Sequence, residues 1–99
     1  MLDVLLLWSK SDESGVQDEW VAKLILIMKE AKGLRQLRVS AGDLMARGGP
    51  PPYSRVIEAS FESLADWMAH VDVLNSRPDL AAYKEAAPPL VLFFEARDA

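Results

Sequence analysis

The stretch from residue 48 to residue 67, GGPPPYSRVIEASFESLADW, limits the possible folds more than any other part of this sequence. Three consecutive prolines lack amide hydrogens and cannot join the ladder of a central strand, so a strand can begin only at about Tyr53. From Tyr53 to Phe61 the odd positions are mainly apolar and the even positions mainly polar, a period of two that predicts a strand. Ser63 and Asp66 then have the spacing of a helix N-terminal cap. The chain therefore passes here from a strand to a helix that covers it.

Other segments show the same two periods. The predicted elements are a strand at Leu2–Trp8, a helix with a capping box at Ser14 and Gln17 and a left-handed C-terminal cap at Gly33, an edge strand at Leu34–Ala41, the strand Tyr53–Phe61, a helix from Ser63 to about Leu74, a short helix at Leu80–Ala86 and a strand at Leu90–Ala96. The order βαββαβ predicts one α+β domain over residues 1–99 with the ferredoxin-like topology: a four-stranded antiparallel sheet with helices on one face.

The composition excludes several classes of function. The chain has 99 residues, enough for one domain, and no cysteine, so disulfides, thiol nucleophiles and thiolate-bound metals are excluded. The net charge is −4 and the basic residues are scattered, which argues against a nucleic-acid partner. No apolar run approaches the roughly 20 residues that span a bilayer. We expect a cytoplasmic protein without a membrane partner.

The first and last predicted strands carry large apolar side chains on both faces. Leu5 and Leu7 alternate with other apolar residues in the first strand, and Leu92 and Phe94 do so in the last. A sheet with one solvated face should alternate cleanly between apolar and polar residues. Too few residues follow Ala96 to cover the second face, so a second copy of the chain is the expected partner. The sequence predicts a homodimer in which two sheets enclose a barrel.

Residues 48–64 also carry a family resemblance. The Gly/Pro-rich loop, Tyr53 at the start of a strand, and the junction Phe61-Glu62-Ser63-Leu64 resemble the EthD-like branch of the dimeric α+β barrel superfamily. This resemblance implies a homodimeric barrel with a small-molecule pocket. EthD-like proteins commonly carry a histidine followed by a small residue and a proline in the first helix, but residues 22–29, AKLILIMK, contain neither histidine nor proline. The usual acid/base candidate of the family is therefore missing here.

Two residues are candidates for proton transfer. His70 is the single histidine, and Asp66 precedes it by one helical turn and could orient its imidazole. The alternative is that Asp66 serves the cap and His70 is a boundary residue. Glu58 shares a strand face with Ser60, and Arg38 could approach it from the neighbouring strand. Glu58 could act as an acid or base in a pocket, or form a structural ion pair with Arg38.

The aromatic residues suggest a pocket for a planar ligand. The predicted pocket residues, which could also be ordinary core residues, are Trp8, Trp20, Arg38, Tyr53, Ser60, Trp67 and Tyr83. We expect no metal and no cofactor, because one histidine without a carboxylate cluster is a poor ligand set. Two functions follow: a protein that binds or transforms a small aromatic or lactone-like molecule, or a structural homodimer without pocket chemistry. An open cavity beside Glu58 would favour the first.

Overall fold

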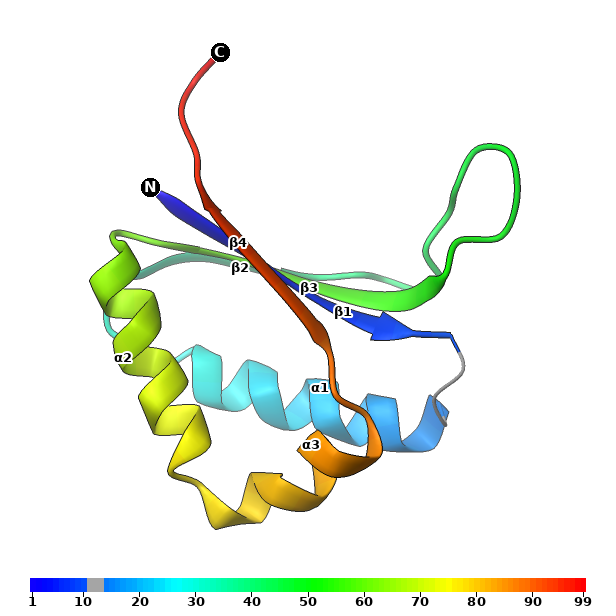
Figure 1. The fold of residues 1–99 in the computed structure, drawn as a ribbon, viewed down its shortest axis with the longest axis horizontal. Coiled ribbons are helices and arrows are strands. Elements are labelled where there is room, and N and C mark those ends of the chain that lie inside the picture. The colour runs from blue at the N-terminus through cyan, green and yellow to red at the C-terminus, as the bar shows by residue number, and fades with distance from the viewer. Residues whose placement is uncertain (11–13) are drawn as a thin grey trace.

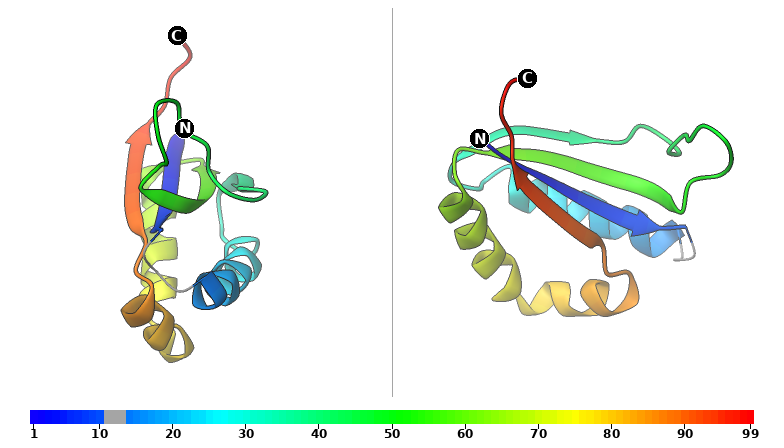
Figure 2. Two further views of the ribbon diagram at one scale, coloured as in Figure 1. Left: turned by 90° about the vertical axis from the view of Figure 1, so that its right-hand side faces the viewer. Right: turned by 45° about the horizontal axis from the view of Figure 1, so that its top comes forward.

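The computed structural model of the protein describes residues 1–10 and 14–99. Its elements are β1 (Leu2–Ser9), α1 (Ser14–Met28), β2 (Leu34–Val39), β3 (Tyr53–Phe61), α2 (Leu64–Asn75), a 3-10 turn (Pro78–Leu80), α3 (Ala81–Ala86) and β4 (Leu90–Glu95). The strands form one antiparallel sheet in the order β2-β3-β1-β4. All the helices lie on one side of this sheet (Figures 1 and 2). The predicted βαββαβ topology is confirmed.

The core forms where β1 faces the helices. Side chains at the even positions of β1 are buried, whereas those at the odd positions are only half-buried. Trp8, at the end of this row, is fully buried, and its indole Nε1 donates a hydrogen bond of 3.1 Å to the carbonyl oxygen of Ala87. This bond connects the central strand to the segment between α3 and β4.

The junction between β3 and α2 follows the sequence prediction. The Ser63 hydroxyl accepts a hydrogen bond of 3.1 Å from the amide of Asp66, so this side chain caps α2. Ile57, Ala59 and Phe61 are buried beneath the helices, as the alternation in β3 predicts. None of the helices in the described part of the chain is long and apolar enough to cross a membrane.

The start of α1 is held by tertiary contacts of Gln17. Its side chain is buried, its Nε2 donates to the carbonyl oxygen of Ser9 at 2.7 Å, and its Oε1 accepts from Ser54 Oγ and Arg55 Nε at 2.9 and 3.2 Å. The side chain of Ser14, the other half of the predicted capping box, lies outside the described residues. Gln17 therefore links α1 to β1 and β3.

Gly33 does not cap the C-terminus of α1, contrary to the sequence prediction. α1 ends at Met28, and Gly33 lies in a turn in which the Leu34 amide donates to the Ala31 carbonyl oxygen at 3.3 Å. Gly33 has a φ of 81°, the left-handed conformation that a cap would also have required, but it serves a turn into β2. Residues 29–31 are no longer helical, so α1 ends before it reaches Gly33. The sequence therefore predicted the left-handed conformation of Gly33 correctly but placed the end of the helix too late.

Replacing Gly33 by alanine should destabilise the protein. A β-carbon at this position would overlap the Asp66 carboxyl group, and a positive φ costs a residue with a side chain about 1–2 kcal/mol. We expect a loss of at least about 2 kcal/mol in the free energy of unfolding, measured by urea denaturation. Gly42→Ala is the matched control, because Gly42 also has a positive φ but a β-carbon there would meet open space. Equal losses in the two variants would show that Asp66 does not restrict this turn.

The sheet face away from the helices, here called the open face, is uncovered in a single chain. Apart from Asp3, its half on β1 and β4 is apolar: Leu90, Leu92 and Phe94 are 43, 45 and 50% exposed, and Leu92 pairs with Leu5. Its half on β2 and β3 is polar apart from Val56. The structure thus confirms that β4 is apolar on both faces and shows that no described element of this chain packs on the open face.

Candidate functional site

Two hollows flank α2 on the helix side of the sheet. One, of about 400 Å³, is bounded by α1, α2, β4 and the prolines that precede β4, and is here called the apolar pocket. The other, of about 630 Å³, lies between α1 and α2 and is here called the interhelical groove. Trp67 and Val71 of α2 contribute to the pocket, whereas His70 and Val73 contribute to the groove. The 3.6-residue period of α2 therefore distributes its side chains between two separate sites.

Aromatic and aliphatic side chains form most of the wall of the apolar pocket. The principal ones are Trp20, Leu24, Trp67, Val71, Val91 and Phe93. Phe93 lies 6.4 Å from Trp67, centroid to centroid, and is still 49% exposed, because neither α2 nor α3 covers the outer edge of β4. This arrangement suits a small apolar ligand.

Both tryptophans of the pocket have a buried indole N–H without a partner. The Nε1 atoms of Trp20 and Trp67 make no hydrogen bond with any residue in 1–10 or 14–99, although each residue is only 2% exposed. A buried N–H without a partner costs about 1–3 kcal/mol. Because both residues line the pocket, a ligand with acceptor oxygens could compensate for this cost.

Other contacts fix the shape of the pocket. Tyr83 stacks on Trp20, with ring centroids 5.5 Å apart and planes 12° apart. Lys84 Nζ, at the polar edge of the pocket, donates to the Leu74 carbonyl oxygen at 2.9 Å and to Asn75 Oδ1 at 3.2 Å. The ammonium group is thus held at the end of α2.

His70 is placed in the groove and not in the apolar pocket. Its side chain is 5% exposed and packs against Phe61 and Trp67, with ring centroids 5.9 and 6.3 Å apart. Burial lowers the pKa of the imidazole below its usual value, so the ring is neutral at pH 7. Asp66 also lines the groove, but within the described residues no hydrogen bond joins it to His70. The predicted catalytic role of His70 stays a prediction.

Glu58, Arg38 and Ser60 lie on the open face, on the opposite side of the sheet from His70. Arg38 Nε and Glu58 Oε1 form an exposed ion pair at 3.5 Å across β2 and β3. Ser60 Oγ donates to Asp3 Oδ1 at 2.8 Å. The cross-strand ion pair that the sequence suggested is present, and the sheet separates Glu58 from both hollows. Its predicted catalytic role also stays a prediction.

The remaining predicted pocket residues divide between pocket and core. Trp20 and Trp67 line the apolar pocket, and Tyr83 supports it through Trp20. Trp8 is a core residue, and half-buried Tyr53, opposite Ser9, lines neither hollow. Sequence reasoning missed Val91 and Phe93 as pocket residues. Their signal was the unbroken apolar run of the last strand, which was interpreted only as a dimer surface.

No protein-family model and no curated protein matches the sequence. Solved structures do match the fold over nearly the whole chain. An EthD family protein from Bacillus halodurans C-125 is 12% identical, with a TM-score of 0.70 over 98% of this chain and 99% of that one. SnoaB, a cofactor-independent oxygenase from Streptomyces nogalater, is 12% identical, with a TM-score of 0.71 over 99% of this chain and 94% of that one.

A hydroxynitrile lyase from Passiflora edulis is 17% identical, with a TM-score of 0.63 over 99% of this chain and 94% of that one. Identities this low establish the fold and not the reaction. The likeness that residues 48–64 suggested is thus present in the arrangement of the whole chain. The protein has the same ferredoxin-like α+β fold as the EthD family protein and SnoaB.

Proposed function

We propose that the protein is a cytoplasmic homodimer that binds or transforms a small aromatic or lactone-like molecule in the apolar pocket, without a cofactor. The observation that carries this proposal is that Trp20 and Trp67, whose buried indole N–H groups lack partners among the described residues, both line a pocket with a mainly apolar wall. A ring system with a carbonyl oxygen would fill the pocket and accept from an indole.

The structural neighbours support a small-molecule role. SnoaB is a cofactor-independent oxygenase, and another protein of this fold is a hydroxynitrile lyase. The same fold thus serves different reactions on small molecules, and the reaction depends on the side chains of each pocket. Neither His70 nor Glu58 lines the apolar pocket of this chain. The side chains of the pocket therefore support binding, and the acid or base for a reaction would have to come from another residue.

The structural homodimer remains a second candidate, and the open face favours it. Leu5, Leu7, Leu90, Leu92 and Phe94 form a continuous apolar surface across the paired strands β1 and β4. Burying this surface between two copies would stabilise the dimer by about 25 cal/mol for each Å² of apolar surface removed from water. The dimer and the pocket are compatible, because they use opposite faces of the sheet.

Coumarin, an aromatic lactone, tests the proposed pocket. We expect saturable binding by isothermal titration calorimetry, and we expect Trp67→Phe or Trp20→Phe to weaken it by about 5- to 10-fold, the equivalent of one hydrogen bond. Naphthalene has no acceptor, so these substitutions should leave its affinity nearly unchanged.

Trp8→Phe is the matched control, because the Trp8 N–H already donates to Ala87 outside the pocket. Its affinity for coumarin should equal that of the unmodified protein. If all three substitutions weakened coumarin binding equally, or if coumarin did not bind at millimolar concentration, the indole N–H groups would not form the proposed site.

A further inference from the structure

We propose that the interhelical groove is a second ligand site, which takes a small apolar carboxylic acid carrying a hydroxyl group at its far end. This site is distinct from the apolar pocket, because its wall is formed by the other side of α2 and by α1 residues that do not line the pocket. The proposal rests on three features of the groove: a buried histidine, an end with two cations and an apolar wall between them.

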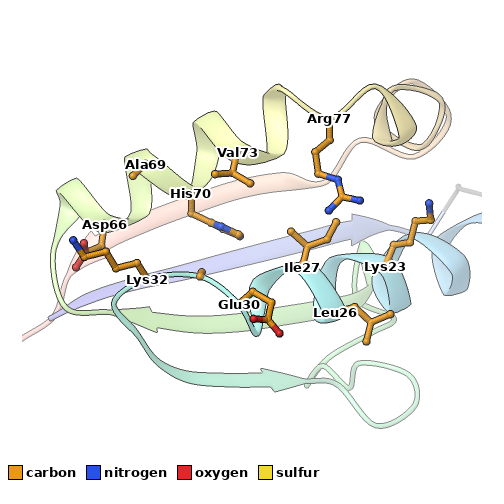
Figure 3. A pocket seen from close by; sticks show the side chains of 11 residues that line it. Lys23, Leu26, Ile27, Glu30, Lys32, Asp66, Ala69, His70, Val73 and Arg77 are labelled. Atoms are coloured by element: carbon orange, nitrogen blue, oxygen red, sulfur yellow. The ribbon is translucent and has the colours of Figure 1, made fainter.

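His70 supplies the first feature. Its imidazole points from α2 into the groove (Figure 3). The ring also packs against Phe61 and Trp67. Its Nε2 atom is buried and makes no hydrogen bond to any side chain or backbone group in the described ranges. A hydroxyl group both donates and accepts, so it can satisfy either tautomer of a neutral imidazole. The ring thus offers a polar contact that the protein itself leaves open.

Lys23 and Arg77 supply the second feature, at one end of the groove (Figure 3). Arg77 donates to Asp79 through Nε and Nη2, at 3.1 and 2.9 Å, and Lys23 Nζ donates to the same carboxylate at 3.3 Å. The hydrogen bond from Arg77 lowers the pKa of Asp79 to about 2, so this carboxylate is ionised. Two positive charges therefore share one negative charge, and further N–H donors remain for an anion.

The spacing of these groups defines the length of the ligand. His70 and Val73 share one side of α2, and Arg77 lies two residues beyond the end of this helix at Asn75, so the last turn of α2 separates the imidazole from the guanidinium group along the groove. Val73, together with Leu26 and Ile27 of α1, provides an apolar wall over this distance. A ligand that contacts both polar groups therefore needs an apolar body between its carboxylate and its hydroxyl.

The opposite end of the groove sets the orientation. Asp66 and Lys32 lie there, and Glu30 lies nearby, across the groove from His70 (Figure 3). Two carboxylates against one ammonium group disfavour an anionic ligand group. The carboxylate of the ligand should accordingly bind at Arg77 and its hydroxyl at His70.

6-Hydroxy-2-naphthoate is a suitable probe. We expect saturable binding by calorimetry, and Arg77→Gln should weaken it by about 10-fold or more because a charged hydrogen bond is lost. The control is Arg35→Gln, which removes an exposed arginine on β2 whose partner is Glu62 at 2.6 Å. 2-Naphthol lacks the carboxylate, so Arg77→Gln should not change its affinity.

The single histidine gives an independent signal. In ¹⁵N NMR of the imidazole, 6-hydroxy-2-naphthoate should shift the Nε2 resonance of His70, whereas 2-naphthoate, which lacks the hydroxyl, should shift it much less. His70→Gln keeps a hydrogen-bonding side chain, and its circular dichroism spectrum would confirm that it folds. It should weaken binding of the hydroxy acid by about 5-fold or more.

Three results would overturn the proposal: no saturable binding of the hydroxy acid, binding insensitive to Arg77→Gln and His70→Gln, or a His70 resonance that does not respond. Loss of binding in Trp67→Phe with full binding in Arg77→Gln would place the acid in the apolar pocket instead. Coumarin tests the apolar pocket and 6-hydroxy-2-naphthoate tests the groove. A negative result with one compound therefore contradicts only the proposal for its own site.

Discussion

Replacing Leu92 by aspartate should convert the protein from a dimer into a monomer at micromolar concentration, as measured by sedimentation velocity. Leu92 lies in β4 on the open face, beside Leu5, and is 45% exposed in a single chain. In the proposed dimer this side chain would be buried against the second sheet. An aspartate there would place two unpaired charges in an apolar interface, at a cost of several kcal/mol for each buried charge.

The matched control is Met45→Asp. Met45 is 96% exposed in the loop between β2 and β3, so the same charge there should leave the dimer intact. Circular dichroism should show that both variants fold, because neither side chain is part of the core of a single chain. A monomeric, well-folded unmodified protein would contradict the proposed dimer, and so would a dimer that tolerates Leu92→Asp.

Replacing Trp8 by alanine should give the largest loss of stability of a single core substitution. Trp8 is fully buried under the helices, and removing such a side chain typically costs about 3–5 kcal/mol. The substitution also removes the donor that pairs with the carbonyl oxygen of Ala87. Since domains of this size are stable by about 5–15 kcal/mol, urea denaturation should show a much lower midpoint or an unfolded protein.

Trp8→Phe separates the two contributions. It keeps an aromatic ring in the core but loses the hydrogen bond to Ala87, so it should cost less than the alanine substitution. A loss below about 1 kcal/mol for Trp8→Ala would mean that the core collapses around the gap or that this tryptophan is not buried in solution.

The elements of the fold could be predicted from local patterns. The prolines before Tyr53, the alternation up to Phe61 and the cap at Ser63 each depend on residues close in sequence, and the structure places each feature at the expected position. The order of the elements then left few topologies, because strand pairing and helix placement follow a small set of rules. Gly33 shows the limit of local reasoning, since a left-handed glycine fits both a helix cap and a turn.

The candidate site could be predicted only in part. Trp20 and Trp67 were expected in a pocket, and they do line one. An open cavity beside Glu58 was the feature that would favour a small-molecule function, yet Glu58 lies on the other side of the sheet from both hollows, with His70 in the groove and Trp67 in the pocket. A pattern assigns a residue to a face of its own element. It does not state which neighbouring element that face meets.

The periods, the caps and the order of strands and helices follow from the amino-acid sequence alone, because they depend on backbone geometry within a few residues. The division of the α2 side chains between two hollows depends on tertiary packing instead, and so does the meeting of Lys23 and Arg77 at one carboxylate. The same holds for the indoles of Trp20 and Trp67, which are buried without partners in the described chain. These properties are set by how closely packed elements approach one another, which local patterns do not specify.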